Sequence, residues 1–335
     1  MYVRGVFAVL AAACVIAVVV SEKVTAQNPP ARGMRWSRAA PFPEPEEELY
    51  GTVLVYEYDP APDKWTKKKS IPVAVHHQAQ AGYNGKIYIF GGCTRAISGE
   101  GGSTNVWEYD PATDNYTAKA PLPVKRCSAI AETVNGKMYV IGGLEPLENG
   151  QGTRVTGRNE MFDPVANTWT ERSPMPTSRN HAFSGVVNNK IYVIGGRIGA
   201  GNIPATTNID VVEEYDPATN LWGPIKDRMP TPRSGGGAAT YQGKIYVGGG
   251  ELQTRQMNAA FRALEAYDPA SNTWDVLPSM PTAVHGNAMG FLGNKLHVVS
   301  GKMEGGGAPD MAGTDHPYAT ASHNVLEIPA ASGSN

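Results

Sequence analysis

The stretch Tyr215-Asp216-Pro217-Ala218-Thr219-Asn220-Leu221-Trp222 is the strongest indication of the fold, because versions of it return along the chain at a nearly fixed spacing. The first residues of the five copies stand at positions 58, 109, 162, 215 and 267, so the spacing is 51 to 53 residues. The copies are Tyr58-Asp59-Pro60 with Trp65, Tyr109-Asp110-Pro111 with Tyr116, Phe162-Asp163-Pro164 with Trp169, Tyr215-Asp216-Pro217 with Trp222, and Tyr267-Asp268-Pro269 with Trp274. A period of this length is typical of propellers and repeat arrays.

A second phrase recurs in step with the first. It reads Gly-Lys-Ile-Tyr-Ile-Phe-Gly-Gly in its first copy. Its five copies span 85–92, 136–143, 189–196, 243–250 and, with Ser300-Gly301 in place of the glycine pair, 294–301. The β-branched and aromatic run inside each copy predicts a buried strand.

Each period divides into four short apolar runs, which we name strands a, b, c and d and which predict an antiparallel sheet. Pairs such as Asn84-Gly85 and Asn135-Gly136 join strands a and b and suit a tight hairpin turn with positive φ. Strand c carries the Tyr of Tyr-Asp-Pro, and strand d begins at the Trp. The order of a glycine pair, a Tyr, a Trp and then Met-Pro or Leu-Pro resembles the kelch repeat family over residues 36–328. This resemblance implies an all-β propeller with four-stranded blades around a central channel.

The copies predict six blades, of which the first is incomplete. The last copy ends without a Trp-led strand d, and Trp36 to Pro43 resembles one, so we expect the N-terminal strand to close the last blade and remove an exposed edge. Only about 13 residues separate Glu46 from Asp59, too few for four strands. The alternative is a ring of five blades, with Trp36 packed elsewhere.

The N-terminus predicts export. Arg4, the apolar run from Gly5 to Val20 and the small residues around Ala26 are typical of a secretory signal peptide. The predicted organisation is therefore a signal peptide over 1–26, a linker over 27–35, the propeller over 36–328 and a disordered tail over 329–335. A secreted or periplasmic protein with no membrane contact after cleavage is expected.

Composition limits the partners. The formal net charge of −2 argues against a nucleic-acid-binding protein. Outside the signal peptide only Cys93 and Cys127 remain, and the sequence leaves open whether they pair. The period also leaves the oligomeric state open, and we expect a monomer.

The residues that open strand a predict the ligand site, since they lie beside the channel on the face where the long b-to-c loops emerge. They are Arg126, Arg179, Arg233, His76, His77, His181 and His285. In kelch propellers that bind peptides or sugars, such arginines line the pocket, and their planar donors suit carboxylates. The competing interpretation is that each Arg binds carbonyl groups or a neighbouring blade.

The histidines raise the question of a metal. Imidazole is a common ligand, and three repeats that meet at one channel mouth supply His76 with His77, His181, and His285. Nothing in their spacing specifies a metal site, so no metal and no cofactor is predicted.

The function predicted is that of a binding module that holds a protein, peptide or glycan ligand at the channel mouth, rather than that of an enzyme. Two enzymes remain as alternatives. A sugar epimerase similar to the sialate mutarotases would need an acid/base pair that faces the bound sugar, with which the Arg and His residues of the mouth are compatible and which Glu145, Glu251 or Glu304 could assist. A copper oxidase similar to galactose oxidase would need a Cys cross-linked to a Tyr, and no motif marks Cys93 or Cys127 for that role.

Overall fold

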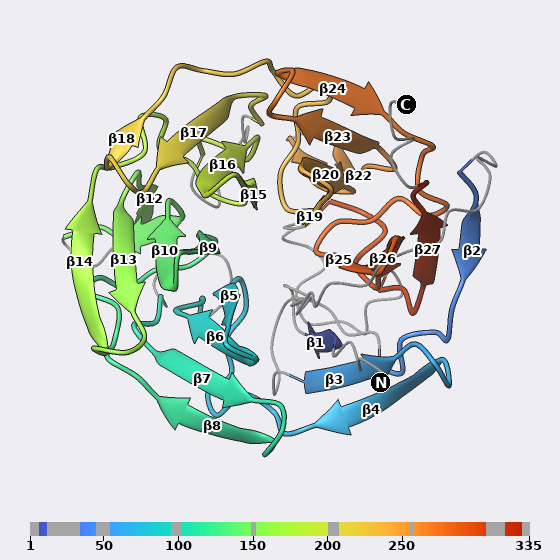
Figure 1. The fold of residues 1–335 in the computed structure, drawn as a ribbon, viewed down its shortest axis with the longest axis horizontal. Helices are drawn as coiled ribbons and strands as arrows, with labels where there is room; N and C mark the ends of the chain where they lie inside the picture. Colours follow the sequence, from blue (N-terminus) through green and yellow to red (C-terminus); the bar gives the residue numbers. More distant parts are fainter. Residues whose placement is uncertain are drawn as a thin grey trace.

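Six β-sheets stand in a ring around a central channel (Figure 1). The computed structural model describes residues 7–11, 34–44, 54–94, 102–148, 152–199, 208–254, 257–305 and 319–329. All elements in these ranges are strands, as the sequence predicts, and none is a helix long and apolar enough to span a bilayer.

Five of the six sheets are complete four-stranded blades. Blade 2 contains β5 (Ala79–Tyr83), β6 (Lys86–Phe90), β7 (Val106–Asp110) and β8 (Asn115–Ala118). Blade 3 contains β9 (Ile130–Val134), β10 (Lys137–Ile141), β13 (Asn159–Asp163) and β14 (Thr168–Arg172). Blade 4 contains β15 (Phe183–Val187), β16 (Lys190–Ile194), β17 (Val212–Asp216) and β18 (Leu221–Trp222). Blade 5 contains β19 (Gly237–Tyr241), β20 (Lys244–Gly248), β23 (Leu264–Asp268) and β24 (Thr273–Val276).

Blade 6 confirms the predicted closure of the ring. It contains β25 (Ala288–Leu292), β26 (Lys295–Val299), β27 (His323–Glu327) and, as its outer strand, β2 (Trp36–Arg38) from the N-terminal part of the chain. Trp36 pairs with Leu326 and Arg38 with Asn324, which covers the edge of β27. Segments nearly 300 residues apart therefore share one sheet, and the last repeat is completed by the start of the propeller.

Blade 1 is incomplete, also as predicted. The chain supplies β3 (Leu54–Asp59) and β4 (Lys64–Lys68), which correspond to strands c and d. β1 (Phe7–Ala11) lies beside β3, at the place that strand b occupies in the other blades, with Phe7 opposite Tyr58. β1 falls inside the predicted signal peptide, and cleavage of that peptide stays a prediction. The linker, apart from residues 34 and 35, and the tail beyond residue 329 lie outside the described residues.

The repeated Tyr-Asp-Pro phrase forms the turn between strands c and d and also ties neighbouring blades together. Within the turn, the Asp216 carboxylate accepts a hydrogen bond from the Ala218 amide at 2.9 Å. Across the blade boundary, Trp222 Nε1 donates to the Ser173 carbonyl of blade 3 at 2.9 Å, and the Asn220 side chain accepts from the Ser173 amide at 2.8 Å. Equivalent bonds link Trp65 to Ala40, Trp169 to Ala120, and Trp274 to Asp227.

The hydrophobic core lies between the faces of adjacent blades. Phe90 of blade 2 and Phe162 of blade 3 are almost fully buried and pack in a T-shaped arrangement, with ring centroids 6.0 Å apart. The a-to-b hairpins that present these faces have the predicted turns, since Asn84 and Gly85 both have positive φ. The glycine pairs are needed because the backbone of the next blade approaches closely. A Cβ on Gly91, for example, would lie 2.4 Å from the Arg126 carbonyl oxygen.

Candidate functional site at the channel mouth

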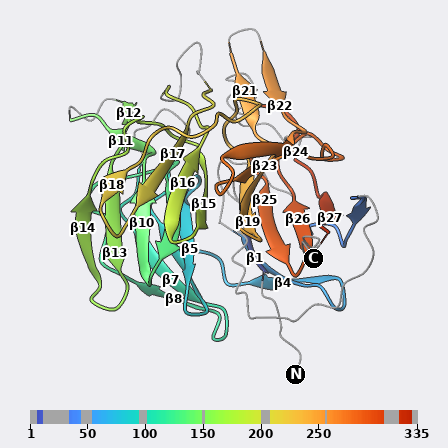
Figure 2. The same ribbon diagram turned by 45° about the horizontal axis from the view of Figure 1, so that its top comes forward.

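The channel mouth is built from two residues of each complete blade, the one before strand a and the one after the glycine pair. Isolated backbone bridges join these residues in all five complete blades. The bridged pairs are His76 with Cys93, Cys127 with Leu144, Asn180 with Arg197, Ser234 with Glu251, and His285 with Lys302. This pairing confirms that the start of strand a and the b-to-c connection emerge on the same face. Two extra hairpins extend this face, β11 (Leu144–Pro146) with β12 (Thr153–Val155) and β21 (Glu251–Gln253) with β22 (Asn258–Ala260) (Figure 2).

One further residue per blade faces the channel directly, and its backbone has a positive φ. These residues are His77, Ser128, His181, Gly235 and Gly286, with φ between 52° and 65°. Their backbones form a chain of hydrogen bonds around the mouth, because each amide from Ser128 to Gly286 donates to the carbonyl of the preceding member at 2.6 to 3.0 Å. Glycine adopts this φ without strain, so the two histidines stand where the backbone favours glycine.

The structure brings the predicted histidines together. The rings of His76 and His77 lie 4.7 Å apart between centroids, and the His77 ring lies 4.7 Å from that of His181, which belongs to a blade two positions away. His285 is close enough to His181 for their charges to interact. The four imidazoles therefore form one cluster at the mouth end of the channel, as the sequence predicts.

His181 is held neutral in this cluster. Burial lowers the pKa of His181 well below its ordinary value, and the charges of Arg197 and the neighbouring histidines lower it further. Arg197 Nη2 donates to His181 Nε2 at 3.1 Å, so that nitrogen is the acceptor and the proton sits on Nδ1, which donates to Asn180. His181 is thus an orienting group with a fixed tautomer.

Arg197 and Glu251 complete the mouth and were not predicted as ligand-binding residues. Arg197 Nη1 lies 2.6 Å from Glu251 Oε1, and His285 Nε2 lies 3.7 Å from Glu251 Oε2. Arg197 and Glu251 each come directly after a glycine pair. That position begins the b-to-c connection in every repeat, and this sequence signal could have identified both residues. The sequence suggests Glu251 only as an acid/base group, whereas in the structure its carboxylate accepts hydrogen bonds from Arg197 and Gln253.

The other two carboxylates considered for acid/base chemistry are also paired. Glu145 accepts from Arg154 and Arg158 at 2.8 Å each across the β11–β12 hairpin. These two arginines lower the pKa of the Glu145 carboxyl, although burial opposes them. Glu304 lies 3.1 Å from Lys302.

The three predicted arginines lie inside the blades rather than in the channel mouth. Their side chains are almost completely buried, and each forms an ion pair with a Glu on strand c of its own blade. The pairs are Arg126 with Glu160 at 2.7 Å, Arg179 with Glu213 at 2.5 Å, and Arg233 with Glu265 at 2.5 Å. Further guanidinium donors of the three residues bind backbone carbonyls, such as those of Gly142, Val193 and Val247. This geometry favours the competing interpretation, in which the arginines stabilise the blades.

Sequence could have indicated this role, because Arg and Glu occur together or not at all. In blades 2 and 6 the position of the Arg holds Val75 and Val284, and the position of the Glu holds Trp107 and Asn324. A ligand-binding Arg would not require a Glu on strand c of its own blade. This co-occurrence is typical of a buried ion pair, because removing one member leaves the other charge buried without a partner.

Below the mouth, the innermost strands β5, β9, β15, β19 and β25 enclose a cavity of about 470 Å³. Gln78 and Gln80 line it, and their side-chain amides have no hydrogen-bond partner among the described residues. Glu132 also lines it and accepts a hydrogen bond from Ser184 at 2.7 Å. Burial raises the pKa of Glu132 to about 7. The cavity thus offers neutral amides and a carboxyl group that titrates near neutral pH.

A disulfide joins Cys93 and Cys127 beside the histidines and connects blades 2 and 3. Their Cα atoms are 5.2 Å apart. Cys93 also lies close to His76 and His77. Among the described residues, these three form the one group of His, Cys, Asp or Glu side chains whose ligand atoms are close enough to share a metal ion.

Comparison with known proteins identifies the repeat. Residues 115–301 match the KLHDC2/KLHL20/DRC7 Kelch-repeats domain, and residues 81–123 match the Kelch motif. The chain is 31% identical over 248 residues to Kelch-like protein terF of Aspergillus terreus, an alignment that covers 72% of this chain and 52% of that protein. It is 29% identical over 238 residues to Kelch repeat and BTB domain-containing protein 12 of Homo sapiens, covering 67% of this chain and 38% of that one.

A solved structure has the same fold. The structure of YjhT aligns with a TM-score of 0.68 at 18% identity and covers 89% of this chain and 98% of that chain. The chain spans about half or less of the length of the curated relatives named above. The repeat phrases, the blades that they form and the match over 115–301 agree, and the chain belongs to the kelch-repeat family of β-propellers.

Proposed function

We propose that this kelch propeller is an exported binding module that holds a protein or peptide partner on its mouth face. The mouth face is the face of the ring on which the b-to-c connections emerge around the channel mouth. Kelch propellers generally bind protein partners, which sets the class of function. The observation that carries the choice of face is the position of three exposed apolar side chains. Ile198, Met257 and Met303 are 45%, 55% and 44% exposed, and all three lie in b-to-c connections.

Exposed apolar groups gathered on one face mark an interaction surface. Methionine suits such a surface because its flexible side chain adapts to a partner. Ile198 directly follows Arg197, and Met303 lies between Lys302 and Glu304. Ile198 and Met303 therefore each have an ion-paired residue directly beside them in the sequence.

A small polar ligand such as a sugar is the second candidate. The supporting observation is the 470 Å³ cavity with the amides of Gln78 and Gln80 along its wall. A buried amide without a partner costs roughly 1–3 kcal/mol, and hydroxyl groups of a glycan would relieve that cost. Such a ligand would bind in the cavity below the histidine cluster, so Ile198, Met257 and Met303 of the mouth face would stay exposed.

Export to a secreted or periplasmic location is supported by the apolar N-terminal run and by the disulfide, since disulfides persist in oxidising compartments. A monomer is proposed for the exported form. The N-terminal sequence and the mass of the protein recovered outside the cytoplasm test this part. We expect a start after residue 26, whereas recovery of the protein only inside cells with residue 1 intact contradicts export.

The binding face is tested with peptides selected from a displayed random library on the wild-type protein. We expect the triple variant Ile198→Asp, Met257→Asp, Met303→Asp to lose most of its affinity for the selected peptides. A matched control changes Val165 and Val276 to Asp. These residues are 82% and 76% exposed but belong to a c-to-d turn and to strand d. Equal losses in both variants contradict a binding site on the mouth face.

A further inference from the structure

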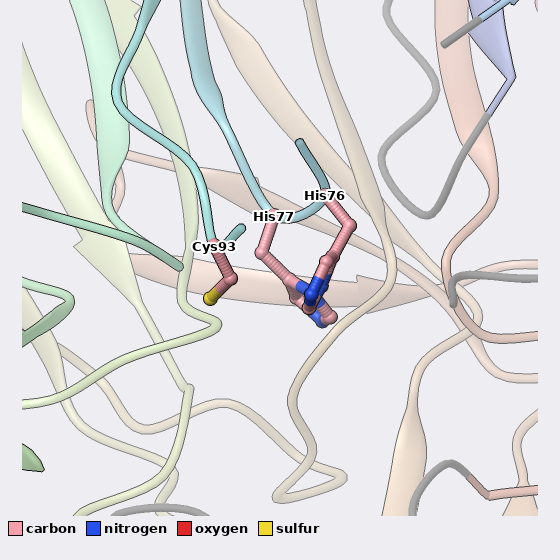
Figure 3. A group of neighbouring side chains, drawn as sticks. All are labelled: His76, His77 and Cys93. Atoms are coloured by element: carbon pink, nitrogen blue, oxygen red, sulfur yellow. The ribbon is translucent and has the colours of Figure 1, made fainter. Parts of the chain in front are cut away.

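His76 and His77 are consecutive residues whose side chains meet. Neighbouring residues of an extended chain point to opposite sides, but His77 has a φ of 55°, which turns its ring back. His77 Nδ1 consequently lies 2.5 Å from His76 Nδ1, and Figure 3 shows the two rings against each other. Blades 5 and 6 carry Gly235 and Gly286 at this position. The chain thus keeps an imidazole where the backbone favours glycine, at a cost on the order of 1 kcal/mol.

Cys93 is fixed opposite His76 by two backbone hydrogen bonds. The His76 amide donates to the Cys93 carbonyl at 3.0 Å, and the Cys93 amide donates to the His76 carbonyl at 2.7 Å. One ring nitrogen of each histidine and the Cys93 sulfur all lie within 4.8 Å of one another, and all three residues are buried. Figure 3 shows the sulfur to one side of the paired rings.

These three atoms suit a small metal ion. Zinc binds imidazole nitrogen at about 2.0–2.1 Å and thiolate sulfur at about 2.3 Å, so tetrahedral ligand atoms lie roughly 3.3–3.6 Å apart. To reach that geometry the two nitrogens would separate by less than about 1 Å, and the sulfur, up to 4.8 Å away, would move closer by about 1 Å. Imidazole and thiolate are also the ligand types that zinc prefers over magnesium or calcium.

We propose that His76 Nδ1, His77 Nδ1 and the Cys93 thiolate bind one zinc ion when the Cys93–Cys127 disulfide is open. The fourth position of the ion remains for water or for a ligand at the channel mouth. This site goes beyond the binding function proposed above, and it departs from the sequence prediction that the chain holds no metal.

The disulfide and the metal use the same sulfur, so they exclude each other. Opening the disulfide takes two electrons and two protons and yields the thiols of Cys93 and Cys127. A dithiol reductant supplies both and becomes a disulfide, whereas a phosphine supplies the electrons, takes an oxygen from water and leaves the two protons of that water to the thiols. Zinc binding then releases the Cys93 proton, because the ligand is the thiolate. Oxidation returns two electrons to an acceptor, re-forms the S–S bond and removes the third ligand.

Two single substitutions separate the metal site from the disulfide. Cys127→Ser and Cys93→Ser both abolish the disulfide, but only Cys127→Ser leaves the proposed ligand in place. Zinc affinity is measured by equilibrium dialysis of metal-free protein, with oxidised and phosphine-reduced wild type alongside. We expect one equivalent of zinc for reduced wild type and for Cys127→Ser, and affinity at least about a hundredfold weaker for oxidised wild type and for Cys93→Ser.

Cobalt provides a second readout. Cobalt-loaded Cys127→Ser is expected to show a sulfur-to-cobalt charge-transfer band that Cys93→Ser lacks. Adding His76→Gln to Cys127→Ser is expected to weaken zinc binding while the thermal unfolding of the metal-free protein changes little. Equal zinc affinity in the two cysteine variants, or absence of zinc from Cys127→Ser, overturns the proposal.

Discussion

Arg197 Nη1 lies 2.6 Å from Glu251 Oε1, and this buried ion pair connects blades 4 and 5 at the channel mouth. Both side chains are at least 96% buried, and Glu251 also lies beside His285. The pair therefore fixes the position of two b-to-c connections, which carry Ile198 and Met257 of the mouth face.

Replacing Glu251 by Gln is expected to destabilise the protein strongly. The substitution keeps the shape of the side chain but leaves the buried Arg197 charge uncompensated, which costs about 3–5 kcal/mol. Chemical denaturation measures the loss in the free energy of unfolding. Asp210→Asn is the control, because it breaks the Arg228 pair at the surface, where the Arg is 59% exposed, and should cost no more than about 1 kcal/mol. Similar small losses in both variants contradict a structural role for Arg197 and Glu251.

The Arg–Glu pairs inside the blades are expected to behave as units. Arg179→Val alone leaves Glu213 buried without its partner and should cost about 3–5 kcal/mol. Adding Glu213→Asn should recover part of that loss, because blade 6 combines Val284 and Asn324 at the same two positions. Denaturation of the single and double variants gives the comparison. If Arg179→Val is as stable as wild type but does not bind the selected peptides, Arg179 belongs to the ligand site instead.

Glu132 is expected to make stability depend on pH. Its pKa is raised from 4.5 to about 7 by burial, so the folded state binds a proton that the unfolded state releases between these values. The free energy of unfolding therefore falls as the pH rises from about 4.5 to about 7 and is level above that range. Glu132→Gln removes this fall and should stabilise the protein by about 1–3 kcal/mol at pH 8 relative to wild type. Denaturation at pH 5 and pH 8 measures both effects, and a wild-type curve that rises across this interval while the variant's is flat contradicts them.

The tryptophan that begins strand d is expected to stabilise the contact between blades through its indole N–H. Trp222→Phe loses the 2.9 Å bond to the Ser173 carbonyl and should cost at least about 1 kcal/mol. Trp222→Tyr should cost less, since Tyr116 stands at the same position in blade 2 and its hydroxyl donates to the Lys69 carbonyl at 2.9 Å. Thermal unfolding ranks the three proteins, and a tyrosine variant less stable than the phenylalanine variant contradicts this account.

The repeated phrases predicted the fold because their residues act locally. Tyr215 to Trp222 makes a turn and one bond to the adjacent blade, and Asn84-Gly85 makes a hairpin, so each copy carries its own instructions. The closure by Trp36 followed from the missing strand of the last repeat. The strand beside β3 was not predicted, because pairing between Phe7 and Tyr58 depends on the edge that the incomplete blade leaves open and not on a local motif.

The site was harder to predict. The repeat spacing shows which blade a residue belongs to, but it does not show whether its side chain points into the blade or toward the channel. Arg179 and His181 are two residues apart, yet one enters the blade and the other faces the channel, since the positive φ of His181 changes the direction of the chain. The pairing of Cys93 with Cys127 likewise depends on how blades 2 and 3 stand next to each other.

Amide hydrogen exchange of the protein with and without a selected peptide shows whether partners bind the mouth face. We expect slower exchange on peptide binding in β21 and β22 and in residues 197–199 and 302–305, with no change in the c-to-d turns around Asp110, Asp163 and Asp216. Protection confined to the c-to-d turns or to the outer strands would contradict binding at the mouth face.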